Sequence, residues 1–394
     1  MKEIYSNINI IGGGLIGALT AYSLSKTGFT ISLIEKKDVY NVKNNLDYRT
    51  VAISEGTKLF LEKIGLWYEI NKYSQPIKKI KIIDRLQSNT LEFDNTRRES
   101  NLGYIVKNKH LLNIVYKKLR QKKNIKIFNN SKIKDFENTN DFIITNTENF
   151  SVYSSLNIAA DGKNSFVRKH YKIPLFTKDY NKKALVITFC HEKNHHGTAY
   201  EFFYKNGPFA ILPMKFQNPN FVSSIVWTNE KNYLDEIMKL SNEKLISILN
   251  KESQYVVGKI KKILTKQSFH LTAHLNTKFY SERTIFIGDS AHSFHPIAGQ
   301  GWNLGMKDLE NLYYLIFKYR ELGIEIGDQL FCKEYHDNNY FNSYRLYQVT
   351  DKLDNLFKIQ NPIISLGRSF GLNIIQKNKT INNFISDFAM GVNL

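Results

Sequence analysis

A glycine-rich stretch near the start of the chain carries residue types that suit a dinucleotide. Gly12, Gly14 and Gly17 have the spacing G-x-G-x-x-G, with strand-like apolar runs on both sides and helical spacing between them. Gly12 permits a tight turn, Gly14 lets the backbone approach a pyrophosphate, and Gly17 allows a helix and a strand to pack closely. Glu35 ends the second apolar run, where a carboxylate can accept a hydrogen bond from a ribose hydroxyl. These features predict a βαβ unit that binds a dinucleotide.

A second stretch, residues 284–312, has the chemistry of another anion site. A strand-like run ends at Asp289, whose carboxylate can accept charge-assisted hydrogen bonds from sugar or ribityl hydroxyls. A loop with Pro296, Gly299 and Gly301 follows, and then a helical pattern. Glycines let backbone N–H groups approach a flat ligand, and a helix N-terminus carries about half a positive charge that suits a delocalised anion. The alternative interpretation is an ordinary strand–loop–helix connection.

Two shorter motifs place further charged residues beside apolar strands. Arg49 lies in the run DYRTVAIS, and its planar guanidinium suits a phosphate. Asp161 follows an apolar strand in the run AADGKNSFVR, at the end of the strand where open α/β sheets bind ligands. Each residue also has a simpler interpretation. Arg49 can pair with Asp47 at the surface, and Asp161 can form an ion pair with Arg168 across a turn.

Together these motifs resemble those of the class A flavoprotein aromatic monooxygenases, and more narrowly the ubiquinone-biosynthesis hydroxylases. The run GDSAHSFHPIAGQGWNLGMKD is similar to the second FAD-binding motif of that family, and AADGKNSFVR is similar to its DG motif. Residues 350–391 fit the C-terminal pattern of the subgroup, so the resemblance covers nearly the whole chain. Trp302 departs from the pattern, because the family more often has leucine there.

The resemblance implies a bound FAD, with NAD(P)H as a co-substrate and no metal. Reduced FAD is a delocalised anion, and in this family its reaction with O₂ gives a C4a-hydroperoxyflavin that hydroxylates an aromatic ring. Pro296 is expected beside the reactive edge of the flavin, and no residue is assigned as a catalytic base. The expected cofactor-binding residues are Gly12, Gly14, Gly17, Glu35, Arg49, Asp161, Asp289, Pro296, Gly299, Gly301, Asn303 and Leu304.

The fold implied by the resemblance is α/β and similar to that of p-hydroxybenzoate hydroxylase. It has a Rossmann-like FAD-binding domain (residues 1–75, 101–180 and 270–345), an inserted antiparallel β-sheet substrate domain (76–100 and 181–269) and a helical C-terminal segment (346–394). Apolar alternation and turn signals between residues 185 and 228 independently predict the antiparallel sheet. Helical spacing also predicts one helix over residues 57–67 and another over 234–250.

The expected activity is hydroxylation of a polyprenylated phenol in ubiquinone biosynthesis. The expected partners are the prenylated phenol, O₂ and other ubiquinone-synthesis proteins. Two alternatives remain open: a flavin monooxygenase or oxidoreductase acting on another aromatic or lipid substrate, and a non-catalytic scaffold of a quinone-synthesis complex. The intact glycine fingerprint, Asp161 and Asp289 argue against the scaffold.

Composition narrows the remaining classes of protein. The 394 residues carry a formal net charge of +19, but the lysines are dispersed among asparagine and isoleucine, as an AT-rich genome would encode. No nucleic-acid-binding module is visible. Two cysteines give no disulfide framework, and His191, His195 and His196 lack cysteine or acidic ligands at metal spacing. No apolar run reaches the roughly 18 residues that span a bilayer. We therefore expect no nucleic-acid partner, no metal, and a cytoplasmic protein with peripheral contact to the inner face of the cytoplasmic membrane.

Overall fold

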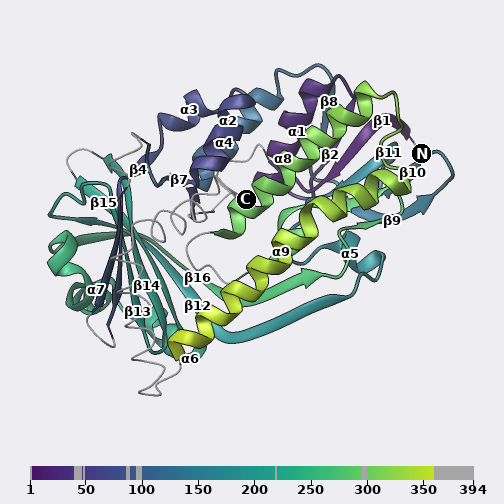
Figure 1. Ribbon diagram of the computed structural model, residues 1–394. Coiled ribbons are helices and arrows are strands. Elements are labelled where there is room, and N and C mark those ends of the chain that lie inside the picture. Colours follow the sequence, from purple (N-terminus) through teal and green to yellow (C-terminus); the bar gives the residue numbers. More distant parts are fainter. Residues whose placement is uncertain are drawn as a thin grey trace.

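The computed structural model of the chain describes residues 2–39, 47, 49–85, 89–94, 100–217, 220–294 and 300–358. Three β-sheets and their helices form two regions that lie side by side (Figure 1). The region at the right of Figure 1 contains both glycine-rich stretches, and the region at the left contains the antiparallel sheet. This arrangement confirms the predicted α/β class with an inserted antiparallel sheet.

The first sheet has eight strands and a parallel centre. Its strand order is β17-β18-β11-β1-β2-β8, and β10 and β9 extend it antiparallel from β11. The central strand β1 is buried at the consecutive residues Ile8, Asn9 and Ile10, as expected for a parallel strand that is covered on both faces. The strands are β1 (Lys2–Ile11), β2 (Ile31–Ile34), β8 (Ile125–Phe128), β9 (Ile133–Asn138), β10 (Ile143–Thr147), β11 (Phe150–Ala159), β17 (Tyr280–Ser281) and β18 (Thr284–Phe286).

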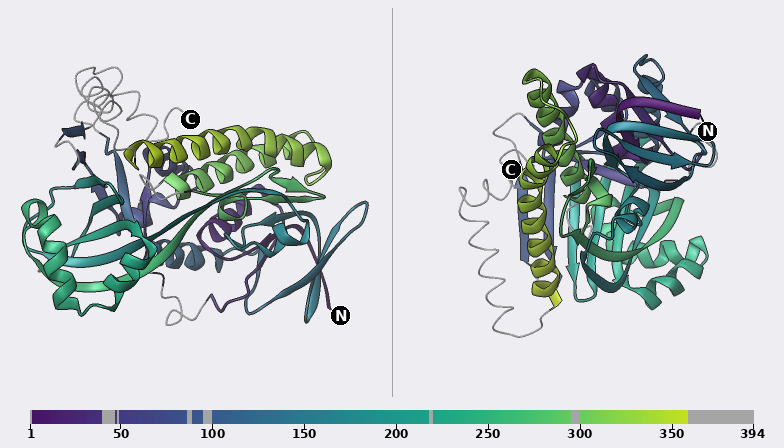
Figure 2. Two further views of the ribbon diagram at one scale, coloured as in Figure 1. Left: turned by 90° about the horizontal axis from the view of Figure 1, so that it is seen from below. Right: turned by 90° about the vertical axis from the view of Figure 1, so that its right-hand side faces the viewer.

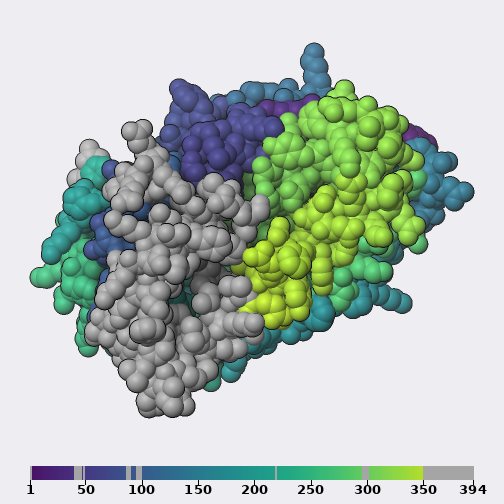
Figure 3. All heavy atoms as spheres, viewed as in Figure 1, coloured from purple at the N-terminus to yellow at the C-terminus, as the bar shows by residue number. Residues whose placement is uncertain are grey.

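Helices cover this sheet and bury one large apolar core with it. The helical pattern expected after Gly301 forms, and its apolar stripe is buried throughout; the stripe comprises Leu304, Met306, Leu309, Leu312 and Ile316. Two long helices, α8 and α9, contact each other and run together along one side of the molecule (Figures 2 and 3). The helices of this region are α1 (Leu15–Leu24), α2 (Glu55–Lys63), α3 (Trp67–Asn71), α4 (Asn108–Leu119), α5 (Phe166–His170), α8 (Gln300–Glu321) and α9 (Gln329–Lys358).

The second sheet also has eight strands, in the order β19-β16-β12-β15-β14-β13-β5-β6. All of its pairs are antiparallel except β13 with β5. Helices α6 (Lys231–Lys239) and α7 (Asn242–Val257) cover one face through a shared apolar cluster. The strands are β5 (Lys79–Asp84), β6 (Asn89–Asp94), β12 (Leu175–His191), β13 (Thr198–Tyr204), β14 (Gly207–Gln217), β15 (Asn220–Glu230), β16 (Ile260–Asn276) and β19 (His292–Ser293).

A third, three-stranded sheet joins the two regions. It has the order β3-β7-β4, with β3 (Thr50–Ile53), β7 (Gly103–Lys107) and β4 (Gln75–Ile77). One side of β7 belongs to the large core, and Ile105 on its other side packs with Ile82 and Met214 of the second sheet. The two 17-residue strands β12 and β16 pair with each other and also reach into both regions. They cross the expected domain boundaries after residues 180 and 269.

Two predicted helices are each interrupted, which corrects the sequence analysis. In place of one helix over residues 57–67, α2 ends at Lys63, Gly65 adopts a φ of +73°, and α3 begins at Trp67. In place of one helix over 234–250, α6 ends at Lys239, and Ser241 caps α7 by accepting a hydrogen bond from the Lys244 N–H. In both cases apolar spacing continues through a local stop signal. The predicted helical C-terminal segment is helical through Lys358, and the rest lies outside the described residues.

Candidate active site

The predicted glycine turn lies between β1 and α1, and two of its glycines are required by close contacts. Gly12 has a φ of +104°, and a Cβ there would stand 2.4 Å from the carbonyl oxygen of Ala160. A Cβ on Gly17 would stand 1.9 Å from the carbonyl oxygen of Gly12. Gly14 differs, because it is the N-cap of α1, has no side-chain cap, and has no atom within 4 Å of a Cβ position. The N-terminus of α1 therefore faces open space.

Glu35 follows β2, as predicted, and holds the glycine turn from the side. Its Oε2 accepts a hydrogen bond from the Gly13 N–H at 2.6 Å, and its Oε1 accepts one from the Lys37 N–H at 2.9 Å. The Tyr116 hydroxyl on α4 donates to the Gly13 carbonyl oxygen at 2.8 Å. The sequence analysis did not single out Gly13 or Tyr116. A Cβ on Gly13 would stand 2.4 Å from the Tyr116 hydroxyl. A glycine between Gly12 and Gly14, where the fingerprint allows any residue, was therefore the sequence signal for this close contact.

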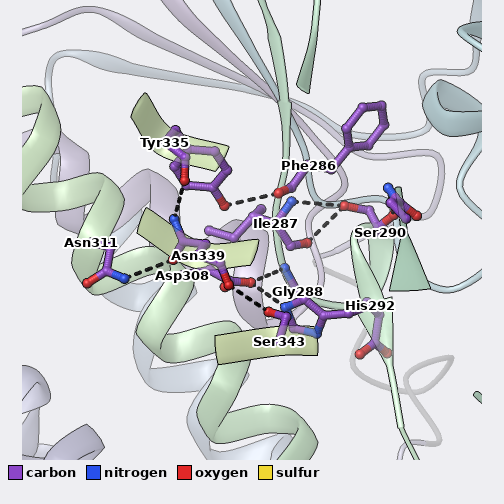
Figure 4. Close-up of polar contacts among 12 residues, drawn as sticks. Phe286, Ile287, Gly288, Ser290, His292, Asp308, Asn311, Tyr335, Asn339 and Ser343 are labelled. Carbon is purple, nitrogen blue, oxygen red and sulfur yellow. Dashed lines mark hydrogen bonds and ion pairs between the residues drawn. The ribbon is translucent and has the colours of Figure 1, made fainter. Parts of the chain in front are cut away.

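The second predicted stretch forms a turn after β18 that is anchored to α8 (Figure 4). The Oδ2 atom of Asp308 accepts a hydrogen bond from the Gly288 N–H at 3.0 Å and lies 2.6 Å from His292 Nε2. Both partners of this His–Asp pair are 1% exposed. Ser290 donates from its hydroxyl to the Ala159 carbonyl oxygen at the end of β11. Asp289, the predicted ligand of this turn, is exposed between these anchors.

Helix α9 also holds the end of this strand (Figure 4). The fully buried Tyr335 donates from its hydroxyl to the Phe286 carbonyl oxygen at 3.0 Å. Asn339 donates from Nδ2 to the Tyr335 carbonyl oxygen and accepts from Asn311 on α8. Burial raises the pKa of Tyr335 well above its usual value, so this hydroxyl stays protonated and remains a donor. The end of β18 is therefore held by α8 and α9 together.

Asp289 has cations from two other predicted motifs beside it. The Arg49 pKa is raised chiefly by its hydrogen bond with Asp47, and the charge of Asp289 adds to that rise. Burial lowers the pKa of Lys163 in the DG motif, and attraction to Asp289 opposes that shift. The alternative pairing of Arg49 with Asp47 is present, with both nitrogen–oxygen distances at 2.8 Å. Arg49 also lies 5.5 Å from the ring centre of Phe269. The structure thus brings three motifs together, and Lys163 was not predicted.

Asp161 caps the short helix α5 and forms no ion pair with Arg168. Its Oδ2 accepts hydrogen bonds from the N–H groups of Phe166 and Val167 at 2.7 and 3.2 Å. Its Oδ1 is buried and has no hydrogen-bond partner among the described residues. Arg168 donates instead to the carbonyl oxygens of Ser290 and Lys163, at 3.0 and 2.7 Å. Arg168 therefore links the DG motif to the Asp289 turn.

Of the predicted residues at the start of α8, Gly301 leaves the backbone accessible among the described residues, whereas the side chains of Asn303 and Leu304 make structural contacts. A Cβ on Gly301 would meet no atom of the described residues within 4 Å, as is also found for Gly14 at the start of α1. Asn303 accepts hydrogen bonds from the Ser54 N–H and the Thr57 hydroxyl, both at 3.0 Å, and its side chain thereby holds α8 against α2. Leu304 is buried in the core, so its side chain is not available to a ligand. Pro296 and Gly299 lie outside the described residues.

The two helix starts are neighbours. The Ile16 side chain on α1 stands 3.2 Å from the place where a Cβ of Gly305 on α8 would be, and the same place is 3.2 Å from the Gly288 Cα. Two helix N-termini, the exposed carboxylate of Asp289 and the cations beside it therefore lie close together among the described residues, and we call this group of residues the cradle. Helix N-termini bind phosphate and other anions through their unpaired N–H groups. The cradle fits FAD, whose pyrophosphate, ribityl chain and ring match these three kinds of group.

Comparison with known proteins agrees with this geometry. Residues 5–321 match the protein family described as FAD binding domain. The chain is 28% identical over 388 residues to the ubiquinone hydroxylase UbiL of Rhodospirillum rubrum, covering 98% of this chain and 90% of that protein. It is 24% identical over 459 residues to the ubiquinone biosynthesis monooxygenase COQ6 of Dictyostelium discoideum, covering 99% and 92%. The crystal structure of p-nitrophenol 4-monooxygenase PnpA from Pseudomonas putida DLL-E4 superposes with a TM-score of 0.81 at 17% identity, covering 99% and 98%.

The fold and the cradle thus define a flavoprotein built on an FAD-binding domain, because that family spans most of the chain and both glycine-rich stretches. More narrowly, this FAD-dependent hydroxylase is similar along nearly its whole length to hydroxylases of ubiquinone biosynthesis. The resemblance noted in its motifs is confirmed, and so is the fold of the p-hydroxybenzoate hydroxylase type.

Proposed function

We propose that this enzyme hydroxylates the ring of a polyprenylated phenol in ubiquinone biosynthesis, using NAD(P)H and O₂. One oxygen atom enters the ring in place of hydrogen, the other leaves as water, and NAD(P)H supplies the two electrons as a hydride. The observation that carries the proposal is the cradle itself, in which Gly14, Gly301 and Asp289 come together from distant parts of the chain. The names of the relatives, UbiL and COQ6, support the substrate class.

We infer that the cofactor is held by the residues that line the cradle. The backbone of Gly12, Gly14 and Gly17 would hold the pyrophosphate, and the backbone at Gly301 and Leu304 would face the flavin ring. The remaining proposed cofactor residues are Glu35, Arg49, Asp161, Asp289, Pro296, Gly299 and Asn303. Bound FAD supplies electron transfer from NAD(P)H and activation of O₂, chemistry that no side chain can perform. The chain's own tasks are to bind the cofactor, orient the ring of the substrate and exclude water.

Contact with a membrane surface is part of the proposal, because a polyprenylated substrate partitions into lipid. The net charge of +19 favours an anionic surface. Within the described residues no helix is long and apolar enough to cross a bilayer. Attachment would therefore be peripheral, and other ubiquinone-synthesis proteins are proposed partners there.

The test uses the purified holoenzyme with NAD(P)H, a phenol that carries a short prenyl chain, and ¹⁸O₂. The expected result is a hydroxylated phenol that contains one ¹⁸O atom, with NAD(P)H consumption that depends on the phenol. Asp289→Ala serves as the flavin-poor comparison. Reduction of FAD by NAD(P)H without oxygen transfer would indicate a reductase or oxidase. Product formation from unprenylated phenols alone would indicate another aromatic substrate.

A further inference from the structure

The second sheet has two faces of different character. Phe202 on β13, Phe209 on β14 and Ile225 on β15 point to one face, where they pack with α6 and α7. Because side chains alternate along a strand, their sequence neighbours point to the opposite face. We call this opposite side the inner face; its members include Ile82, Glu201, Ala210, Leu212, Ser224 and Val226.

The inner face meets the cofactor region at both of its sides. On one side Ile82 and Leu212 pack with Ala52 and Ile105 of the three-stranded sheet. On the other side Val226 and Tyr347 of α9 both pack against one apolar cluster that includes Ala184 and Leu271. Strand β14 contacts both β7 and α9, so the middle of the face lies between them. Phe269 of β16 lies on the same face, and the Arg49 guanidinium of the cradle is 5.5 Å from its ring centre.

Glu201 is a carboxyl in the middle of this apolar face. Its cross-strand neighbours are Ala210 on β14 and Ile82 on β5, and Val226 follows Ala210 on the next strand. The side chain is partly buried, and no hydrogen bond or ion pair reaches it from the described part of the chain. Burial alone raises its pKa to about 8. An unpartnered carboxyl in apolar surroundings destabilises a fold, so its presence indicates a ligand.

Ser224 is a second unpartnered polar group on the inner face. It is fully buried, and its hydroxyl has no hydrogen-bond partner among the described residues. It pairs across strands with Leu212 on β14 and Thr188 on β12. Glu201 and Ser224 are two strands apart and one row apart, which places their Cα atoms about 12 Å from each other. One aromatic ring with its oxygen substituents can reach both side chains across that distance.

We propose that Glu201 accepts the proton of the ring hydroxyl of the phenol, and that Ser224 donates a hydrogen bond to a second ring oxygen. The proposal rests on the proposed function, and it names the residues that hold the substrate. The O–H bond of the phenol breaks, the proton moves to a carboxylate oxygen of Glu201, and the ring keeps the electron pair. The ring thereby becomes richer in electrons at the carbon to be hydroxylated. The proton returns to the ring oxygen of the product.

The chemistry of Glu201 suits this task. A general base is most effective when its pKa lies near the working pH, and a value of about 8 satisfies that condition. No charge near Glu201 contributes to the shift. The charged and titratable groups that face the inner side, among described residues, include Arg49 beside Phe269, Lys182 and Cys190 on β12, Asp84 on β5, Lys107 on β7 and Tyr347 on α9.

The test compares Glu201→Gln with the wild-type holoenzyme across pH 6 to 9.5, using a phenol that carries one isoprene unit. For the wild type, kcat/KM should rise about tenfold per pH unit up to an apparent pKa near 8 and then level off. In the variant this limb should vanish, and kcat/KM at pH 9 should fall at least a hundredfold, as for a lost general base. FAD content should stay unchanged, because Glu201 lies outside the cradle. Ser224→Ala should raise KM several-fold and keep the pH limb.

Glu92→Gln is the matched control, since it makes the same change on β6 of the same sheet. Glu92 pairs with Lys79 and Lys81 on the other face, so its pH profile should equal that of the wild type. A wild-type pH profile in Glu201→Gln, with kcat/KM within twofold, would overturn the proposal.

Equilibrium dialysis of the phenol without NAD(P)H distinguishes failure of the proposed reaction from failure of the proposed binding site. In one outcome, the wild type fails to hydroxylate the phenol and still binds it in a pH-dependent way that is lost in Glu201→Gln. That result would refute the proposed reaction and support the proposed binding site. Binding that is equal in both proteins at every pH removes the site as well.

Discussion

Replacing Gly14 with alanine should separate cofactor binding from folding. Gly14 has a φ of −65°, which alanine adopts freely, and a Cβ there meets no protein atom within 4 Å. Loss of a glycine N-cap in favour of alanine costs about 1 kcal/mol, so the protein should fold. The added methyl group, however, fills the space in front of the N-terminal N–H groups of α1. Losing one charge-assisted hydrogen bond to the pyrophosphate costs about 1.5–3 kcal/mol, which weakens FAD binding roughly ten- to a hundredfold.

Gly17→Ala provides the contrast on the same helix. Its Cβ would stand 1.9 Å from the Gly12 carbonyl oxygen, so backbone atoms must shift at a cost of about 1–3 kcal/mol or more in stability. The assays are urea unfolding of the FAD-free proteins and fluorescence titration with FAD. We expect Gly14→Ala to lose affinity with little loss of stability, and Gly17→Ala to lose stability. Wild-type FAD affinity in Gly14→Ala, within twofold, would show that the open space at α1 does not receive the pyrophosphate.

Three further outcomes are expected. Asp289→Ala should weaken FAD binding roughly tenfold or more in the same titration, because a charge-assisted acceptor is lost, whereas Asp141→Ala in the exposed β9–β10 turn should bind normally. His292→Ala should lower the free energy of unfolding by about 3–5 kcal/mol in urea, because it removes the side-chain partner of the buried Asp308 carboxylate and leaves it only the Gly288 N–H; equal stability to the wild type would show that the pair is dispensable. Stability should also fall as the pH drops below about 6.5, because burial lowers the pKa of His191 to about 4 and that of His274 to about 3, so the unfolded chain binds more protons in that window. Each histidine contributes a slope of up to about 1.4 kcal/mol per pH unit, and urea unfolding at pH 7.5 and 5 should show a shallower loss in His191→Gln.

The sequence predicted the parts of the site that depend on local backbone geometry. The glycine spacing around Gly12 and the strand that ends before Asp289 specify their own turns, and both turns form as expected. The residue spacing could not show which hydrogen-bond partners would come from elements far away in the sequence. Glu35 accepts a hydrogen bond from the Gly13 N–H, and Asn303 accepts hydrogen bonds from Ser54 and Thr57, because packing brings distant elements together.

Long-range pairing also explains what the sequence analysis missed in the second sheet. Strand β16 has no strong alternation of its own over its exposed half, and it becomes a strand by pairing along β12. Glu201 looks like an ordinary polar residue in an alternating strand. Only the strand register shows that it lies on the inner face among Ile82, Ala210 and Val226.

The threading of the first sheet has a consequence during synthesis on the ribosome. Strand β1 emerges well before β11, one of its two partners, and β11 in turn pairs with β18, which emerges later still. The hydrogen bond between Ser54 and Asn303 that holds the start of α8 joins residues 249 positions apart. At a synthesis rate of about 5–20 residues per second, the start of α8 is made on the order of 15–60 s after the glycine turn at residues 12–17. The apolar strand β1 must be shielded during that time, and flavin capture should follow synthesis of α8, as a late sign that the FAD-binding region has folded.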